Sequence, residues 1–192
     1  MLWFSSYVIV FEFSWKVKEK IKKGGITYWL TLVYGIIFWG GSSKSNQVFK
    51  IQKRAIRIML RVSMRSSCRQ LFKKLYIQPL PSVYIAQTLM YVKKNIKCYS
   101  TNSQVHTYNT RGKNNLYTIP HSTSLYSESF IHTGLQLDNT LPGYLKEMPH
   151  SKFKPQLQDL LHKNSFYSVK EFNEYFQNKD EAKPTTEICL HV

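Results

Sequence analysis

Residues 46–62, NQVFKIQKRAIRIMLRV, contain neither Gly nor Pro and repeat their apolar side chains with the period of an α-helix. On a helix that turns about 100° per residue, one sector carries only cations. These cations are Lys50, Lys53, Arg54, Arg57 and Arg61. The remaining circumference is largely apolar, and serines at 42, 43 and 45 offer N-cap oxygens. The stretch therefore predicts a strongly amphipathic, basic helix.

The basic character continues beyond this helix. Ser66 and Ser67 precede a shorter helical pattern in which Cys68, Leu71 and Phe72 share one face. Its cations point away from that face and extend the predicted basic surface. They are Arg65, Arg69, Lys73 and Lys74.

Two prolines then interrupt the pattern within residues 78–82, and we expect a third helix over 83–96. Periodicity fails over residues 99–138, where Ser, Thr, Asn and His dominate, so we predict a long irregular segment there. Residues 139–177 favour two or three short helices, one of them opened by the capping-box spacing of Ser168 and Glu171.

The fold class that follows is mainly α-helical. We expect a basic helical bundle over 26–98, the irregular middle over 99–138 and short C-terminal helices over 139–177. The apolar and basic residues 1–25 remain unassigned, and the polar residues 178–192 are expected to form a frayed tail.

The charge distribution narrows the classes of partner expected for this chain. The 192 residues include 27 Lys and Arg against 11 Asp and Glu, a formal net charge of +16. No Asp or Glu occurs between Glu19 and Glu128, whereas 18 Lys and Arg occur from Lys20 to Lys113. Such an excess favours a polyanionic partner, either RNA or DNA or an acidic membrane surface. Mixed charges would serve solubility equally well, so the one-sided charge argues against a merely solvated helix face.

Catalytic and metal-binding patterns are absent from the sequence. The aspartates Asp138, Asp159 and Asp180 include no pair suited to two-metal chemistry, and no Gly-rich phosphate loop occurs. Three cysteines and six histidines are widely spaced, without the spacing of a zinc module. We therefore expect no enzymatic activity from this chain alone, no cofactor and no bound metal.

With catalysis and metal binding not indicated by the sequence, contact with nucleic-acid backbone is the function that we expect. The nine cations of the two basic helices would neutralise phosphates and release counterions. In the irregular segment, Tyr108 and Arg111 could add base stacking and backbone contacts, or serve the fold instead. An intracellular location, in cytoplasm or nucleus, would suit such a partner.

A membrane alternative stays open. Residues 2–13 and 26–41 are apolar and flank a group of lysines, which would suit a membrane-associated hairpin. The second run has 16 uncharged residues, short of the ~20 that a spanning helix needs. A buried core segment is the reading we favour for it.

Seven blocks, in one order, resemble a known family. They are YGIIFWG (34–40), QKRAIR (52–57), SCRQLF (67–72), LPSVYI (80–85), HTYNTR (106–111), NTLP (139–142) and FYSVKEF (166–172). The succession resembles the region that follows the polymerase palm in insect non-LTR retrotransposon reverse transcriptases of the jockey-like kind. The resemblance covers roughly residues 31–176.

The resemblance implies a helical, thumb-proximal fragment of an RNA-directed DNA polymerase, a transposable-element enzyme. Such a fragment would hold the template-primer, and its natural partner would be the palm, which carries the family's catalytic aspartates and has no counterpart in this chain. The stretch WLTLV (29–33) departs from the family pattern, as do residues 1–25. A truncated or degraded copy is the expected origin.

Overall fold

The computed structural model describes residues 35–107 and 111–181. This part of the chain is mainly α-helical, as the sequence predicts, and its one β feature is an isolated antiparallel bridge between Thr101 and Leu116. The longer helices are α4 (Ser45–Met59), α6 (Leu80–Lys94), α9 (Phe130–Thr140), α11 (His150–Asn164) and α12 (Val169–Glu181). Short helices join them: α3 (Ile36–Trp39), α5 (Arg69–Lys74), η1 (Ile96–Cys98), α7 (Asn102–Val105), α8 (Ser124–Ser127) and α10 (Gly143–Lys146).

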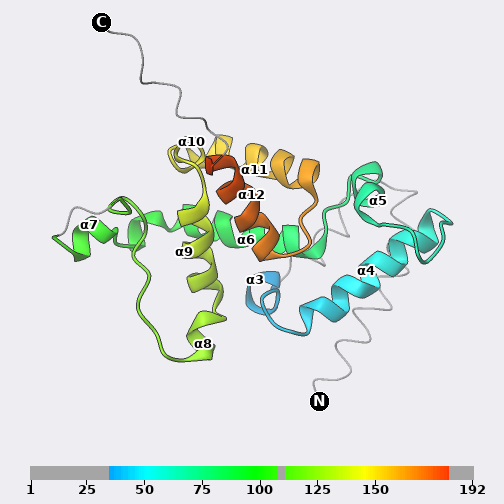
Figure 1. Ribbon diagram of the computed structural model, residues 1–192, viewed down its shortest axis with the longest axis horizontal. Helices are drawn as coiled ribbons and strands as arrows, with labels where there is room; N and C mark the ends of the chain where they lie inside the picture. The colour runs from blue at the N-terminus through cyan, green and yellow to red at the C-terminus, as the bar shows by residue number, and fades with distance from the viewer. Residues whose placement is uncertain (1–34, 108–110, 182–192) are drawn as a thin grey trace, which may run out of the picture.

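Helix α6 is the axis of the molecule (Figure 1). It contacts α3, α4, α9, α11 and α12. Most of its residues are buried, including polar Ser82 and Thr88. A helix that is buried around most of its circumference belongs to the interior rather than to a surface layer. The N-terminal and C-terminal halves of the chain therefore share α6 instead of folding apart.

Three hydrophobic clusters follow α6 along its length. The first joins it to α3, α4 and α5 through Ile56 and Phe72, and the second joins it to α9–α12 through Phe153 and Phe172. The third, at its C-terminal end, holds Val92, Leu116 and Leu135. Apolar burial of this extent supplies the main stabilising term of the fold.

Helix α4 is anchored to α6 by a buried glutamine that the sequence did not single out. Gln52 Nε2 donates to the carbonyl oxygen of Gln78 at 3.0 Å, and Gln52 Oε1 accepts from the backbone N–H of Leu80 at 2.9 Å. The amide thus caps the first turn of α6 and fixes the position of the basic helix against the core.

Helix boundaries differ from the sequence prediction in ways that have local causes. Helix α4 ends at Met59, three residues early, because Arg61 turns the backbone into the left-handed region. Helix α6 begins at Leu80, inside the segment predicted as a break, because Pro81 lies in its first turn and needs no N–H there. The serines before α4 and α5 make no capping hydrogen bond to either helix.

The prediction of irregular structure over residues 99–138 is wrong at the C-terminal end of that segment. Residues 130–138 belong to α9, which Ser129 caps by accepting from the N–H of His132 at 3.2 Å. The helix contains Thr133 and Gly134, which have low helix propensity, so its sequence shows little local signal. Packing against α6 supplies the stability that the helix propensity of these residues does not.

The C-terminal helices extend further than predicted. Helix α12 continues to Glu181, so the first four residues of the predicted tail are helical. Ser168 Oγ accepts from the N–H of Glu171 at 3.1 Å, which confirms half of the predicted capping box, while Glu171 reaches back to the N–H of Tyr167 instead. Residues 1–25 and 182–192 lie outside the described part.

Candidate nucleic-acid interface

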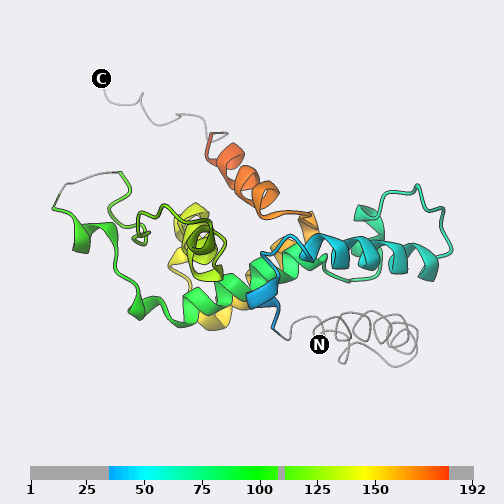
Figure 2. The same ribbon diagram turned by 90° about the horizontal axis from the view of Figure 1, so that it is seen from below.

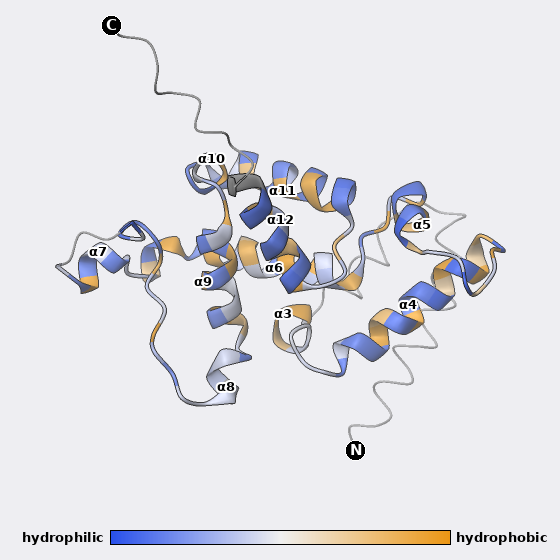
Figure 3. Ribbon diagram, viewed as in Figure 1, coloured by the Kyte–Doolittle hydropathy of each residue, from blue (hydrophilic) through white to orange (hydrophobic). Residues whose placement is uncertain are grey.

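The nine predicted cations of α4, α5 and the loop between them lie at one end of the molecule (Figures 1 and 2). We call this set the α4–α5 surface. Its members are Lys50, Lys53, Arg54, Arg57, Arg61, Arg65, Arg69, Lys73 and Lys74. Figure 3 shows hydrophilic stretches on both helices, interrupted on α4 by apolar residues.

Five of these cations are exposed: Lys50, Arg54, Arg61, Arg65 and Lys74. Within the part of the chain that the structure describes, none of the five forms an ion pair or a side-chain hydrogen bond. Unpaired cations on adjoining elements repel one another, and an approaching polyanion relieves that repulsion. These five side chains are therefore free to contact phosphate.

Other members of the surface are committed to the fold. Arg57 Nε donates to the carbonyl oxygen of Ser66 at 2.9 Å and thereby holds the loop 60–68 against α4. The ammonium of Lys53 lies 4.5 Å from the ring centroid of Phe49 and 5.6 Å from that of Tyr167. Both residues are half-buried, so they shape the surface more than they extend its reach.

Arg69 connects the surface to the C-terminal helix. Its guanidinium forms an ion pair with Glu171 and lies 4.6 Å from the ring centroid of Tyr167. Burial raises the pKa of Glu171, but hydrogen bonds from Arg69 and from the Tyr167 N–H outweigh it, so the net pKa lies below its ordinary value. The carboxylate that neutralises Arg69 comes from 102 residues along the chain.

Tyr167 is the centre of an aromatic cluster beneath the surface. Its ring meets Phe49 at 5.0 Å and Phe72 at 6.0 Å, both edge-on. Burial raises the pKa of Tyr167 to about 12. Sequence reasoning missed Tyr167 and Glu171 as parts of this site, because nothing in a local pattern pairs α12 with α5.

Cys68 is buried at the base of the surface, with Sγ 3.6 Å from the carbonyl oxygen of Lys53. Burial raises the pKa of its thiol against the lowering effect of Arg57 and Lys53. A protonated, buried thiol is a poor nucleophile, which fits a packing role.

Arg61 holds an unusual backbone conformation. It follows the end of α4 with φ at 51°, in the left-handed region where Gly is preferred. The N–H of Arg61 donates to Ile58 and that of Val62 donates to Arg57, at 3.2 and 3.1 Å. The chain thus keeps a cation at a position where glycine would be less strained.

Of the two loop residues predicted to bind nucleic acid, the structure describes only Arg111 and does not bring it to the α4–α5 surface. Arg111 is exposed in the turn that packs on α7, at the opposite end of the long axis (Figures 1 and 2). Tyr108 lies outside the described residues. A loop without periodicity gave no means of placing either residue in space.

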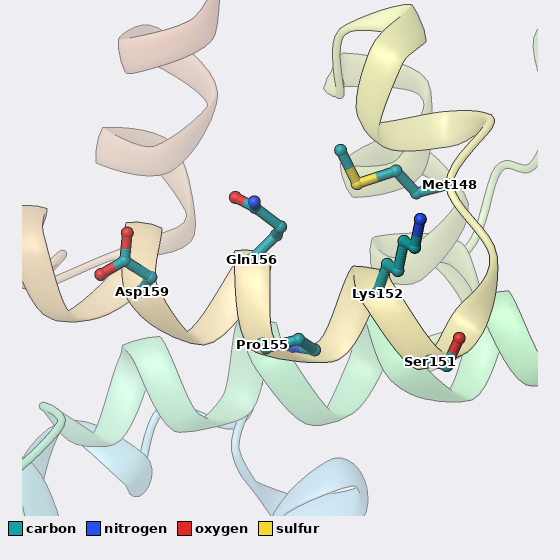
Figure 4. A pocket seen from close by; sticks show the side chains of 6 residues that line it. All are labelled: Met148, Ser151, Lys152, Pro155, Gln156 and Asp159. Atoms are coloured by element: carbon teal, nitrogen blue, oxygen red, sulfur yellow. The ribbon is translucent and has the colours of Figure 1, made fainter.

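No catalytic constellation emerges from the described residues. A hollow on α11 is lined by Met148, Ser151, Lys152, Pro155, Gln156 and Asp159. Figure 4 shows five of these side chains spread along α11 and Met148 on the segment that precedes it, so the six do not converge on one point. The Asp159 carboxylate is engaged by Lys163 at 2.7 Å.

Metal ligands do not gather in the described part of the chain. Within it, no group of three or more His, Cys, Asp or Glu side chains could hold a metal ion. His121 and His132 lie side by side, with ring centroids 4.5 Å apart, but form only a pair. Burial, and then the neighbouring His121, lower the pKa of His132, as expected of an interior imidazole.

The described helices bear on the membrane alternative. Among the described residues, every helix is too short or too polar to cross a bilayer. Residues 2–13 and most of 26–41 lie outside this range. The described remainder of the second apolar run forms α3, where Ile36 is fully buried and Phe38 is 78% exposed.

Comparison with protein-family models, with curated proteins and with solved structures gives no match to this chain.

Proposed function

We propose that the chain binds the phosphate backbone of RNA or DNA through the α4–α5 surface. The observation that carries the proposal is the group of five exposed cations without an intramolecular partner among the described residues. Arginine and lysine on adjoining elements form the electrostatic footprint of a nucleic-acid-binding protein. The buried aromatic cluster beneath them holds the two helices in a fixed relation.

The proposal extends to the parent protein. We infer that the chain is a thumb-proximal fragment of a jockey-like retrotransposon reverse transcriptase and that its own role is to grip the template-primer. The support is the seven sequence blocks together with the basic helical surface. The palm of the parent enzyme would be its protein partner, and cytoplasm or nucleus would be its location. The fragment by itself should not extend a primer in the presence of Mg²⁺.

A salt titration tests the binding proposal. The surface variant carries Lys50→Gln, Arg54→Gln, Arg65→Gln and Lys74→Gln. The control variant carries Lys152→Gln, Lys154→Gln, Lys163→Gln and Lys170→Gln, so each variant loses four positive charges at exposed positions. Affinity for a fluorescent single-stranded RNA and for a DNA duplex is then measured across salt concentrations.

The two variants should differ in the slope of log affinity against log salt. Each phosphate contact contributes about 0.7 to this slope for single strands and about 0.9 for duplex. The surface variant should therefore lose roughly 2.8 units of slope on single-stranded RNA and roughly 3.6 on the DNA duplex, whereas the control variant keeps the wild-type slope. Equal slopes for the two variants would refute the α4–α5 surface as the binding site.

A further inference from the structure

The described residues of the predicted irregular segment around α7 have a defined structure, held by backbone hydrogen bonds. Three backbone hydrogen bonds of 2.8–2.9 Å join its two stretches of chain. They run from the N–H of Asn102 to the carbonyl oxygen of Asn115, from Ser103 to Lys113 and from Tyr117 to Ser100. Thr101 and Gln104 form a capping box on α7. Residues 96–105 and 111–117 thus fold into one compact unit, which we call the distal knot.

Asn139 of α9 fixes the distal knot to the core. Its side-chain amide pairs with the backbone of Leu116 in both directions, accepting at 2.8 Å and donating at 2.9 Å. Lys146 adds a contact to Asn115 Oδ1 at 3.2 Å, and the Leu116 side chain is buried in the third hydrophobic cluster. The knot therefore presents its surface in a fixed orientation relative to α6.

That surface is basic. Lys97, Arg111 and Lys113 are exposed on the knot, and exposed Lys94 lies at the end of α6 just before it. None of the four forms an ion pair with a described residue. No Asp or Glu occurs in this stretch of sequence, from Lys94 to Ser127. An exposed His106 packs edge-on against Tyr117 beside them, with centroids 5.6 Å apart.

The knot is electrostatically independent of the α4–α5 surface. Gln52 binds the first residue of α6, whereas the knot follows its last turn. A 15-residue α6 is about 22 Å long at a rise of ~1.5 Å per residue. That length is more than twice the Debye length of ~8 Å at physiological salt. Figures 1 and 2 show the two regions at opposite ends of the long axis.

We infer that the distal knot is a second phosphate-binding surface, so that one molecule holds two separate nucleic-acid segments, one at each end of α6. The inference rests on the proposed function for the identity of the polyanion. A short duplex would occupy either end alone. Two short duplexes, or a strand long enough to fold back, would engage both ends together.

The test uses two short duplexes, about 12 base pairs each, one labelled with a fluorescence donor and the other with an acceptor. The knot variant carries Lys94→Gln, Lys97→Gln, Arg111→Gln and Lys113→Gln. It has the same formal charge as the surface variant and the control variant described above. Energy transfer between the duplexes reports bridging, and anisotropy of one duplex reports binding.

Wild type and the control variant should bring the duplexes together. The knot variant should lose most of the energy transfer and still bind one duplex through the α4–α5 surface, with at most a two-fold loss of affinity. Transfer that persists in the knot variant would overturn the second surface. The two proposals fail separately: if the surface variant binds as wild type while the knot variant loses binding, the α4–α5 proposal falls and the knot stands.

Discussion

Arg61 combines backbone strain with exposed charge. A non-glycine residue in the left-handed region destabilises the folded chain by about 1–2 kcal/mol. A glycine removes this strain, but the greater freedom of its unfolded chain offsets part of the gain in stability. Arg61→Gly should therefore raise the free energy of unfolding by roughly 1 kcal/mol in a denaturant titration. It should also lower the salt slope of nucleic-acid binding by about one phosphate contact.

Two further variants separate these effects. Tyr76 occupies the equivalent position after α5, with φ at 52°, so Tyr76→Gly should stabilise to a similar degree. Arg61→Lys keeps both the strain and the charge and should behave as wild type. If Arg61→Gly left affinity unchanged, Arg61 would not contact phosphate, whatever its effect on stability.

Glu171 makes the joint between α5 and α12 sensitive to pH. Its pKa is lowered in the folded chain, so its contribution to stability is present above its unfolded pKa of ~4.3 and is lost as pH falls through the folded value. The wild type should therefore lose stability more steeply than Glu171→Gln between about pH 5 and pH 3. Thermal unfolding at intervals across this range measures the difference.

Glu174 provides the matched control for that experiment. Its side chain is 54% exposed and, among the residues that the structure describes, it pairs with Lys170 on the same helix, at 3.7 Å. Glu174→Gln should keep the wild-type pH profile. Parallel profiles for wild type and Glu171→Gln would mean that the ion pair with Arg69 adds no stability.

At the scale of elements, Gly134 shows how α9 is held. A Cβ at this position would lie 2.7 Å from Val92 Cγ2 and 2.9 Å from Thr88 Cγ2, both on α6. Gly134→Ala should destabilise the chain by up to about 2 kcal/mol, because overpacking costs about 1–3 kcal/mol and the helix propensity gained returns only ~1 kcal/mol. The denaturation midpoint should fall accordingly.

Gly143 is the matched control, since it begins α10 and a Cβ there meets nothing within 4 Å. Gly143→Ala should be neutral or slightly stabilising. A stabilised Gly134→Ala would show that α9 and α6 have room to separate, and the close approach described above would then be wrong.

These elements also show what the sequence could and could not predict. Helix α4 was predictable because its cations and apolar residues repeat with the helical period, and that pattern also places its exposed cations. Helix α9 was not, because its stability comes from contact with α6 rather than from its own residues. The link between Arg69 and Glu171, and the distance between Arg111 and α4, depend on tertiary packing that local periodicity does not encode.

For the whole molecule, the net charge of +16 lowers the stability of the folded state and at the same time favours nucleic-acid binding. Unpaired cations at both ends of α6 repel their neighbours in the folded state, and salt screens that repulsion as the Debye length falls from ~10 Å at 0.1 M to ~3 Å at 1 M. Sodium chloride should therefore raise the Tm over this range by roughly 2–4 °C, the shift that 1 kcal/mol produces in a chain of this size. Nucleic-acid affinity should fall over the same range.

The surface and knot variants isolate the cause. Each removes four cations that repel within one end of the molecule, so each should show a higher Tm at 0.1 M salt and a smaller rise on adding salt. The control variant loses two lysines that pair with Asp159 and Glu174, and it should keep the full salt dependence. If all three variants shifted alike, the repulsion would come from the net charge as a whole. Clustered cations at the two ends would then not be its source, and the case for two local phosphate-binding surfaces would lose its electrostatic support.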